Sequence, residues 1–160
     1  METVHSADGT TIAVERVGDG PPLVLVVGAF CDRGTLRGLA EMLSGHLAVL
    51  TYDRRGRGAS GDTPPYSVDR ELEDLDAVIS EAGGAAFVYG HSSGAILSLE
   101  AAARGLPVTK LAAYEPPYIA DDTRSRPQQF DRAGERTGGV RAPRRRRRDV
   151  SSRARKRRPR

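Results

Sequence analysis

Five residues in the middle of the chain, Gly90-His91-Ser92-Ser93-Gly94, restrict its fold more than any other feature of the sequence. They join an apolar run at 86–89, which has the pattern of a buried strand, to an Ala- and Leu-rich stretch at 93–104, which has the pattern of a helix. A turn this tight forces its central residue into a strained backbone conformation. The residues two before and two after the serine must be small, and both are glycine. The sequence therefore predicts a sharp turn that lifts the Ser92 hydroxyl above the carboxyl edge of a sheet.

The remainder of the first 123 residues alternates apolar runs with helical patterns. Two runs flank Asp8-Gly9, which indicates an antiparallel hairpin, and Leu23–Val27 is apolar throughout, as strands buried on both faces are. The predicted strands are 3–6, 11–17, 23–27, 48–52, 86–89 and 110–114, and the predicted helices are 35–43, 67–82 and 93–104. This order predicts an α/β fold, in which a mostly parallel sheet with antiparallel strands at its start carries helices on both faces.

Charge divides the chain into two parts near residue 123. Residues 1–123 hold 9 Lys and Arg against 18 Asp and Glu, whereas residues 124–160 hold 16 against 3. The basic part includes an unbroken arginine run, 144–148, and too few large apolar residues to offset the entropy of ordering it. We therefore predict a folded core over 1–123 and a disordered Arg-rich tail over 124–160. Two origins of the tail stay open: a polyanion-binding segment, or out-of-frame translation of GC-rich coding sequence.

The composition also argues against several classes of protein. The single cysteine, Cys31, cannot form an internal disulfide, which argues against a secreted disulfide scaffold and favours a reducing cytosol. The first nine residues lack the apolar stretch of a signal peptide, and the longest apolar run, Leu23–Val27, is far shorter than the roughly 20 residues of a membrane helix. We expect a cytoplasmic protein without a membrane span.

A second loop, Asp53 to Ser60, follows the predicted strand 48–52 and is rich in glycine and arginine. Such a composition is also found in phosphate-binding loops, but no helical pattern begins directly after Gly58, as a P-loop requires. We expect instead a structural loop that braces the Ser92 turn. Asp53 in this loop is expected to pair with a nearby arginine or to accept hydrogen bonds from backbone N–H groups.

The order of the elements, the loop Asp53–Ser60 and the turn Gly90–Gly94 together resemble the α/β-hydrolase superfamily, and within it single-chain bacterial esterase- or haloperoxidase-like members. The resemblance spans residues 3–122 and implies a Ser–acid–His triad with neither a metal ion nor an organic cofactor. The implied reaction is attack by Ser92 on the carbonyl of a small ester-like molecule. Ala29, in the loop after 23–27, and Ser93 would donate the backbone N–H groups of the oxyanion hole.

Each of these assignments has a competing interpretation. Ser93 is a second candidate nucleophile, although it lies one residue into the helix with its side chain turned away from the apex of the turn. The turn itself can be interpreted as a Gly/Ser loop that opens a helix, and Val27–Phe30 as an ordinary strand-to-helix connection. Cys31 is expected to be a packed thiol rather than a reactive one.

The resemblance breaks after residue 122, because the triad acid and histidine should follow the nucleophile in that order. The chain contains three histidines, His5, His46 and His91. The expected topology places none of them to take the proton of Ser92. The acidic residues near the expected position of the triad acid are Glu115, Asp121 and Asp122. We therefore expect a serine hydrolase core that is truncated after its sixth strand and crippled in catalysis.

The alternative function belongs to a different class. In it the protein is non-catalytic, and the basic tail binds nucleic acid or another polyanion through the release of counterions. The tail lacks interleaved aromatic residues, so such binding is expected to be non-specific.

Overall fold

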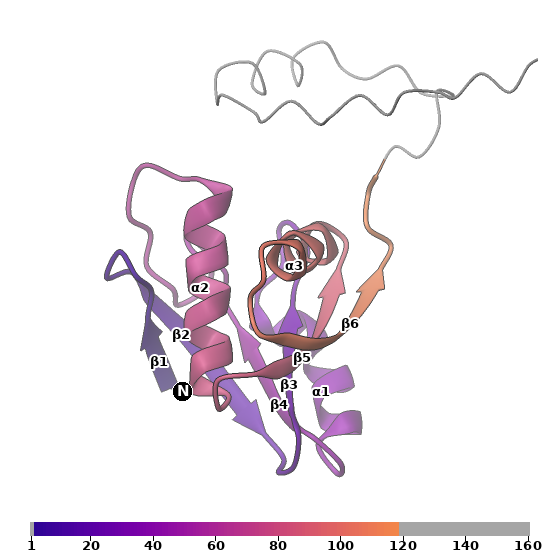
Figure 1. Cartoon of the computed structure of the whole chain (residues 1–160). Helices are drawn as coiled ribbons and strands as arrows, with labels where there is room; N and C mark the ends of the chain where they lie inside the picture. Colours follow the sequence, from indigo (N-terminus) through magenta and orange to yellow (C-terminus); the bar gives the residue numbers. More distant parts are fainter. Residues whose placement is uncertain (1, 119–160) are drawn as a thin grey trace, which may run out of the picture. The chain divides into compact units, whose positions relative to one another are not determined.

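The computed structural model describes residues 2–118, which form a six-stranded sheet with helices on both faces (Figure 1). The strands are β1 (Glu2–His5), β2 (Thr11–Val17), β3 (Pro22–Val26), β4 (Ala48–Tyr52), β5 (Ala86–His91) and β6 (Val108–Tyr114). The helices are the 3-10 turn η1 (Arg33–Leu36) and the α-helices α1 (Arg37–Leu43), α2 (Val68–Glu81) and α3 (Ser93–Ala103). The predicted tail at 124–160 and the last residues of the predicted core, 119–123, lie outside the described residues.

The strands follow the order β1-β2-β4-β3-β5-β6 across the sheet. β2 pairs antiparallel with both β1 and β4, whereas β3 pairs parallel with β4 and β5, and β5 pairs parallel with β6. The predicted mixed sheet with an antiparallel start is therefore confirmed. Because β3, β4, β5 and β6 run in the same direction, their carboxyl ends and the loops that follow them meet at one edge of the sheet.

The central strands bury side chains on both faces of the sheet. Val24 and Val26 of β3 pack in the cluster that includes residues of α2 and α3, while Leu23 and Leu25 pack in the cluster that includes Ala40 of α1. In Figure 1, α2 and α3 lie in front of the sheet and α1 lies behind it. This two-sided burial explains why 23–27 is a continuous apolar run instead of an alternating one.

Helix α2 begins where its sequence pattern predicts. Ser67 has an extended backbone, and its hydroxyl accepts a hydrogen bond from the N–H of Arg70 at 3.2 Å. Asp69 and Glu71 lie in the first turn, where negative charge favours the helix dipole. The apolar stripe that the helix buries against the sheet consists of Leu72, Leu75, Val78 and Ile79.

β1, β3 and β6 begin one or two residues earlier than predicted, and two further differences have reasons of pairing and capping. β5 continues through Gly90 and His91, because these residues pair with Ala113 and Tyr114 of β6. The turn to α3 is consequently concentrated at one residue, Ser92. The predicted helix 35–43 is divided into η1 and α1, since the Asp32 carboxylate accepts a hydrogen bond from the Gly34 N–H at 3.0 Å and starts a 3-10 turn first.

Candidate active site

Ser92 is the single residue between the end of β5 and the start of α3. Its backbone has φ 55° and ψ −120°, a region that non-glycine residues rarely occupy, so the predicted strained conformation is present. Its N–H donates to the carbonyl of Tyr114 at 2.9 Å, and its own carbonyl accepts from the N–H of Ala95 at 2.9 Å. The neighbouring strand and the first turn of the helix thus hold the strained residue from both sides.

The two glycines that flank this turn are required by its packing. A methyl group on Gly94 would overlap the carbonyl oxygens of Val26 and Val27, and one on Gly90 would lie 2.5 Å from the Cα of Ala95. These neighbours are backbone atoms, which cannot move aside as a flexible side chain would. The prediction that both positions must be small is confirmed.

The loop after β3 packs directly against the serine. A Cβ atom on Gly28 would lie 3.2 Å from the Cβ of Ser92 and 3.3 Å from the carbonyl oxygen of His91. Ala29 follows Gly28 and is exposed, and Phe30 has φ 59° with a fully exposed side chain. The structure therefore brings Ser92, Ser93 and the Gly28–Ala29 peptide together at the carboxyl edge of the sheet.

The loop Asp53–Ser60 has the structural role expected of it. Asp53 is fully buried and its carboxylate accepts hydrogen bonds from the N–H groups of Arg33 and Ala59, each at 2.8 Å. The same carboxylate forms an ion pair with the Arg33 guanidinium. Both expected partners of Asp53, an arginine and backbone N–H groups, are present, and the loop is held in one conformation beside the site.

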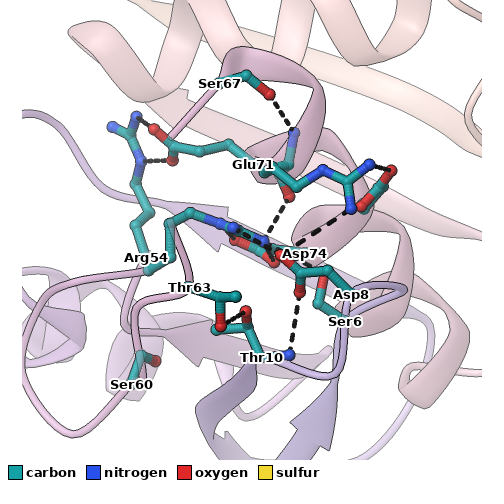
Figure 2. Close-up of polar contacts among 12 residues, drawn as sticks. Ser6, Asp8, Thr10, Arg54, Ser60, Thr63, Ser67, Glu71 and Asp74 are labelled. Carbon is teal, nitrogen blue, oxygen red and sulfur yellow. Dashed lines mark hydrogen bonds and ion pairs between the residues drawn. The ribbon is translucent and has the colours of Figure 1, made fainter. Parts of the chain in front are cut away.

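Arg54 connects this loop to the serine turn, a contact that the sequence did not reveal. Its side chain is buried and forms a bidentate ion pair with Glu71 of α2, at 2.5 and 2.6 Å (Figure 2). Its Nη1 also donates to the hydroxyl of Ser93 at 3.0 Å and to the carbonyl of Val27 at 3.3 Å. One guanidinium therefore contacts both the loop after β3 and the first residue of α3.

The charge of Glu71 is preserved by its partners although the group is buried. Burial by itself would raise the pKa of Glu71, but hydrogen bonds and charge from Arg54 and the hydroxyl of Tyr66 hold its pKa below the ordinary value. Tyr66 donates to a carboxylate oxygen of Glu71 at 2.8 Å. The Arg54–Glu71 pair is thus ionised at neutral pH and rigidly supported.

Arg55, the next residue, has entirely different contacts. Its guanidinium pairs with Asp74 at 2.7 and 2.8 Å and with Asp8 at 2.9 Å. Asp74 lies one turn after Glu71 on α2, and Asp8 lies in the β1–β2 hairpin, as Figure 2 shows. Arg55 therefore joins the hairpin to α2 and contacts neither segment beside Ser92. The sequence contains both halves of these pairs, two adjacent arginines and two carboxylates spaced by three in a predicted helix, but no pattern in it assigns one to the other.

The three histidines lie on separate segments, His5 in β1, His46 before β4 and His91 at the end of β5, directly before Ser92. The ring of His91 stacks on Tyr114 with 5.7 Å between centroids, and His46 precedes β4 at the opposite, amino-terminal edge of the parallel strands. Within residues 2–118 no histidine forms a hydrogen bond with Ser92, and the Nδ1 of His91 is buried without a hydrogen-bond partner. Glu115 follows β6 directly, while Asp121 and Asp122 lie outside the described residues.

Two hollows border the site. One has a volume of about 490 Å³ and lies between the loop of Ala29 and the segment Gly56–Gly58. The other has a volume of about 390 Å³ and is lined by Arg54 and Ser93 together with apolar side chains of α3. A larger hollow of about 640 Å³ lies between β1 and α2. Three strands separate β1 from β5 in the sheet, so this hollow plays no part in the chemistry proposed for Ser92.

Two other kinds of feature are absent from residues 2–118. Nowhere in residues 2–118 do three or more His, Cys, Asp or Glu side chains gather as a metal ion would require. In the same part of the chain, no helix combines the length and apolar character needed to cross a membrane.

Comparisons with known proteins agree with this geometry. Among solved structures, the chain is similar to an alpha/beta hydrolase from Sphaerobacter thermophilus, with 59% sequence identity and a TM-score of 0.78 over 84% of this chain and 53% of that one. It is 32% identical over 117 residues to N-formylmaleamate deformylase from Pseudomonas putida, and 31% identical over 96 residues to the uncharacterized hydrolase YraK from Bacillus subtilis.

The chain spans only part of these relatives. The two alignments cover 71% and 58% of this chain but 44% and 35% of the deformylase and of YraK. A model of the alpha/beta hydrolase family matches residues 23–159. Since that match includes well over half of the sequence and agrees with the sheet and the serine turn, the protein belongs to the alpha/beta hydrolase family.

Proposed function

We propose that the protein is a serine hydrolase in which Ser92 is the nucleophile and an ester-like carbonyl compound is the substrate. The observation that carries the proposal is the strained backbone of Ser92 at the end of β5, with Gly28 packed against it. A relative is named for the deformylation of N-formylmaleamate, which accords with attack on a carbonyl carbon.

The reaction begins with attack of the Ser92 Oγ on the carbonyl carbon of the substrate, while the hydroxyl proton passes to a base from solution, which is water or added imidazole. The carbonyl π electrons move to the oxygen, and the N–H groups of Ala29 and Ser93 hold the resulting oxyanion. Collapse of this intermediate breaks the bond to the leaving group, which takes a proton from the protonated base and departs as the alcohol, and leaves an acyl group on Ser92. Water then attacks the acyl-enzyme and releases the carboxylic acid and the free Ser92 hydroxyl. The helix dipole of α3 favours the negative charge at its amino terminus.

The 160-residue chain is expected to carry out this reaction slowly. Its three histidines give Ser92 no general base in the geometry described above, and loss of one triad member costs several orders of magnitude while binding and the oxyanion hole retain a residual rate. Imidazole in solution can take the place of a missing histidine as the proton acceptor.

The test is hydrolysis of p-nitrophenyl acetate by the full chain and by Ser92→Ala, each with and without added imidazole. We expect the wild-type rate to exceed that of Ser92→Ala, the difference to grow with imidazole, and an acyl adduct to appear on Ser92 in the mass spectrum. Equal rates for the two proteins at every imidazole concentration would overturn the proposal and favour a non-catalytic function. Ser93→Ala separates the two candidate nucleophiles, because it retains the adduct on Ser92 only if Ser92 attacks.

A further inference from the structure

The peptide between Gly28 and Ala29 is held by one side chain. The Nη1 of Arg57 donates a hydrogen bond to the carbonyl oxygen of Gly28 at 2.7 Å. Within residues 2–118 no other group forms a hydrogen bond with this peptide. A trans peptide is planar, and its C=O and N–H point in opposite directions, so fixing the carbonyl of Gly28 also fixes the direction of the Ala29 N–H.

The bond from Arg57 also changes the strength of that donor. A guanidinium that donates to a carbonyl polarises the whole amide, which makes the N–H of the same peptide a better donor. Arg57 is half-buried, lines the hollow beside Ala29 and forms no ion pair with a carboxylate in residues 2–118. The contact that the Arg57 guanidinium makes at hydrogen-bond distance within residues 2–118 is therefore the one with the Gly28 carbonyl.

Arg54 acts on the second donor and on the same loop. Its Nη1 binds the hydroxyl of Ser93, the residue proposed to supply the second N–H, and the carbonyl of Val27, the residue before Gly28. Glu71 holds the remainder of the guanidinium in a bidentate pair. The spacing between the N–H groups of Ala29 and Ser93 therefore depends on the ionised side chain of Arg54 as well as on the backbone of the loop.

We propose that Arg54 and Arg57 are positioning residues that form a guanidinium clamp on the oxyanion hole: Arg57 orients the Ala29 N–H through the carbonyl of Gly28, and Arg54 ties the Val27 carbonyl to Ser93. The inference rests on the proposed function of Ser92. Neither arginine contacts the substrate in this scheme. Both act through the two backbone donors, whose alignment matters only when negative charge develops on the substrate oxygen.

Arg55 provides a matched control within the same loop. It is a buried arginine with a bidentate carboxylate partner on α2, as Arg54 is, but its contacts lie in the β1–β2 hairpin and α2. Arg55→Lys should therefore reduce the free energy of unfolding without changing the oxyanion hole. Arg54→Lys removes a comparable set of guanidinium hydrogen bonds next to Ser92.

The principal variant is Arg57→Met, which keeps the aliphatic stem and leaves no buried carboxylate unpaired. We expect kcat for the Ser92-dependent, imidazole-assisted hydrolysis of p-nitrophenyl acetate to fall about tenfold with KM unchanged, since loss of an entire oxyanion donor costs about 10²–10³. Arg57→Lys should recover part of the loss, and Ser93→Ala, which retains the backbone N–H, should lower kcat less than Arg57→Met. Arg55→Lys should leave kcat per folded molecule unchanged.

A second measurement, the amide NMR spectrum, reports directly on the Ala29 N–H. In the amide NMR spectrum of the full chain, the Ala29 resonance should shift in Arg57→Met and stay in place in Arg55→Lys. If wild type shows no Ser92-dependent rate, the proposed function fails and this spectrum alone decides the clamp. An Ala29 resonance unmoved by Arg57→Met, or equal kcat losses in Arg57→Met and Arg55→Lys, would overturn the clamp even if Ser92 is reactive.

Discussion

At the scale of single residues, the geometry of the site depends on three glycines whose lack of a side chain allows close packing around Ser92. Gly90 and Gly94 allow β5 and α3 to approach closely enough that Ser92 alone makes the turn. Gly28 plays a similar part from the opposite side, where a Cβ atom would lie 3.2 Å from the Cβ of Ser92. These three contacts link sequence composition directly to the geometry of the proposed nucleophile.

The close packing at Gly94 predicts a large effect of a small substitution. In Gly94→Ala the added methyl group would overlap the carbonyl of Val26, so we expect the free energy of unfolding to fall by at least about 2 kcal/mol. Urea denaturation followed by circular dichroism measures this loss.

Gly38 supplies the control for that substitution. It lies in α1, and a Cβ atom there would meet nothing within 4 Å. Gly38→Ala should therefore be neutral or stabilise the protein by up to about 1 kcal/mol, because alanine favours the helix. Similar losses in the two variants would mean that the turn tolerates a side chain at position 94.

At the scale of elements, local patterns predicted the number, type and order of the strands and helices, but pairing decided their ends. β5 is longer than its apolar run because β6 offers hydrogen-bond partners to Gly90 and His91, whatever their own preference for strand. The effect is functional, because the extra pairs bring Tyr114 to the position where its carbonyl accepts the N–H of Ser92.

Helix α2 carries both carboxylates that hold the arginine pair, so its start is a sensitive point. Ser67→Ala removes the hydroxyl that accepts the Arg70 N–H and should reduce the free energy of unfolding by about 1 kcal/mol. Ser80, which is exposed near the other end of the same helix, is the matched control. Ser80→Ala should change the free energy of unfolding by only about a few tenths of a kcal/mol. Equal urea midpoints for the two variants would show that the cap contributes nothing.

At the scale of the whole molecule, buried ion pairs connect the hairpin, the loop Asp53–Ser60 and α2, and they make stability depend on pH. Hydrogen bonds from Thr10 and Arg55 hold the pKa of Asp8 below its ordinary value, and Arg54 and Tyr66 do the same for Glu71 against the effect of burial. A depressed pKa in the folded state means that the unfolded chain takes up protons more readily as the pH falls.

The sign of the pH effect follows from these two groups. The stabilisation is complete above the ordinary pKa values, 3.8 for Asp and 4.5 for Glu, and should be lost progressively as the pH falls below them. Urea midpoints at pH 7, 5 and 3.5 measure the loss. Asp8→Asn should be less stable than wild type at pH 7 yet lose less between pH 5 and pH 3.5, and parallel profiles for the two proteins would contradict this assignment.

The sequence by itself determined the local parts of the site. The period of the apolar residues specifies which segments are strands and helices, and the small residues around Ser92 specify a tight turn between two of them, because both constraints act over a few neighbouring positions. The same local reasoning brought Ala29 and Ser93 to one edge of the sheet, since parallel strands share a carboxyl edge.

Only the tertiary structure decided which charged residue serves which partner. Arg54 and Arg55 are adjacent and identical, and Glu71 and Asp74 are separated by one helical turn, so no local pattern distinguishes the two pairs. The path of the loop after β4 points one arginine toward Ser93 and the other toward the hairpin. Contacts of this kind join residues far apart in the chain, and packing rather than propensity selects them, which is why the partners of Arg54 and Arg55 could not be predicted while the tight turn at Ser92 could.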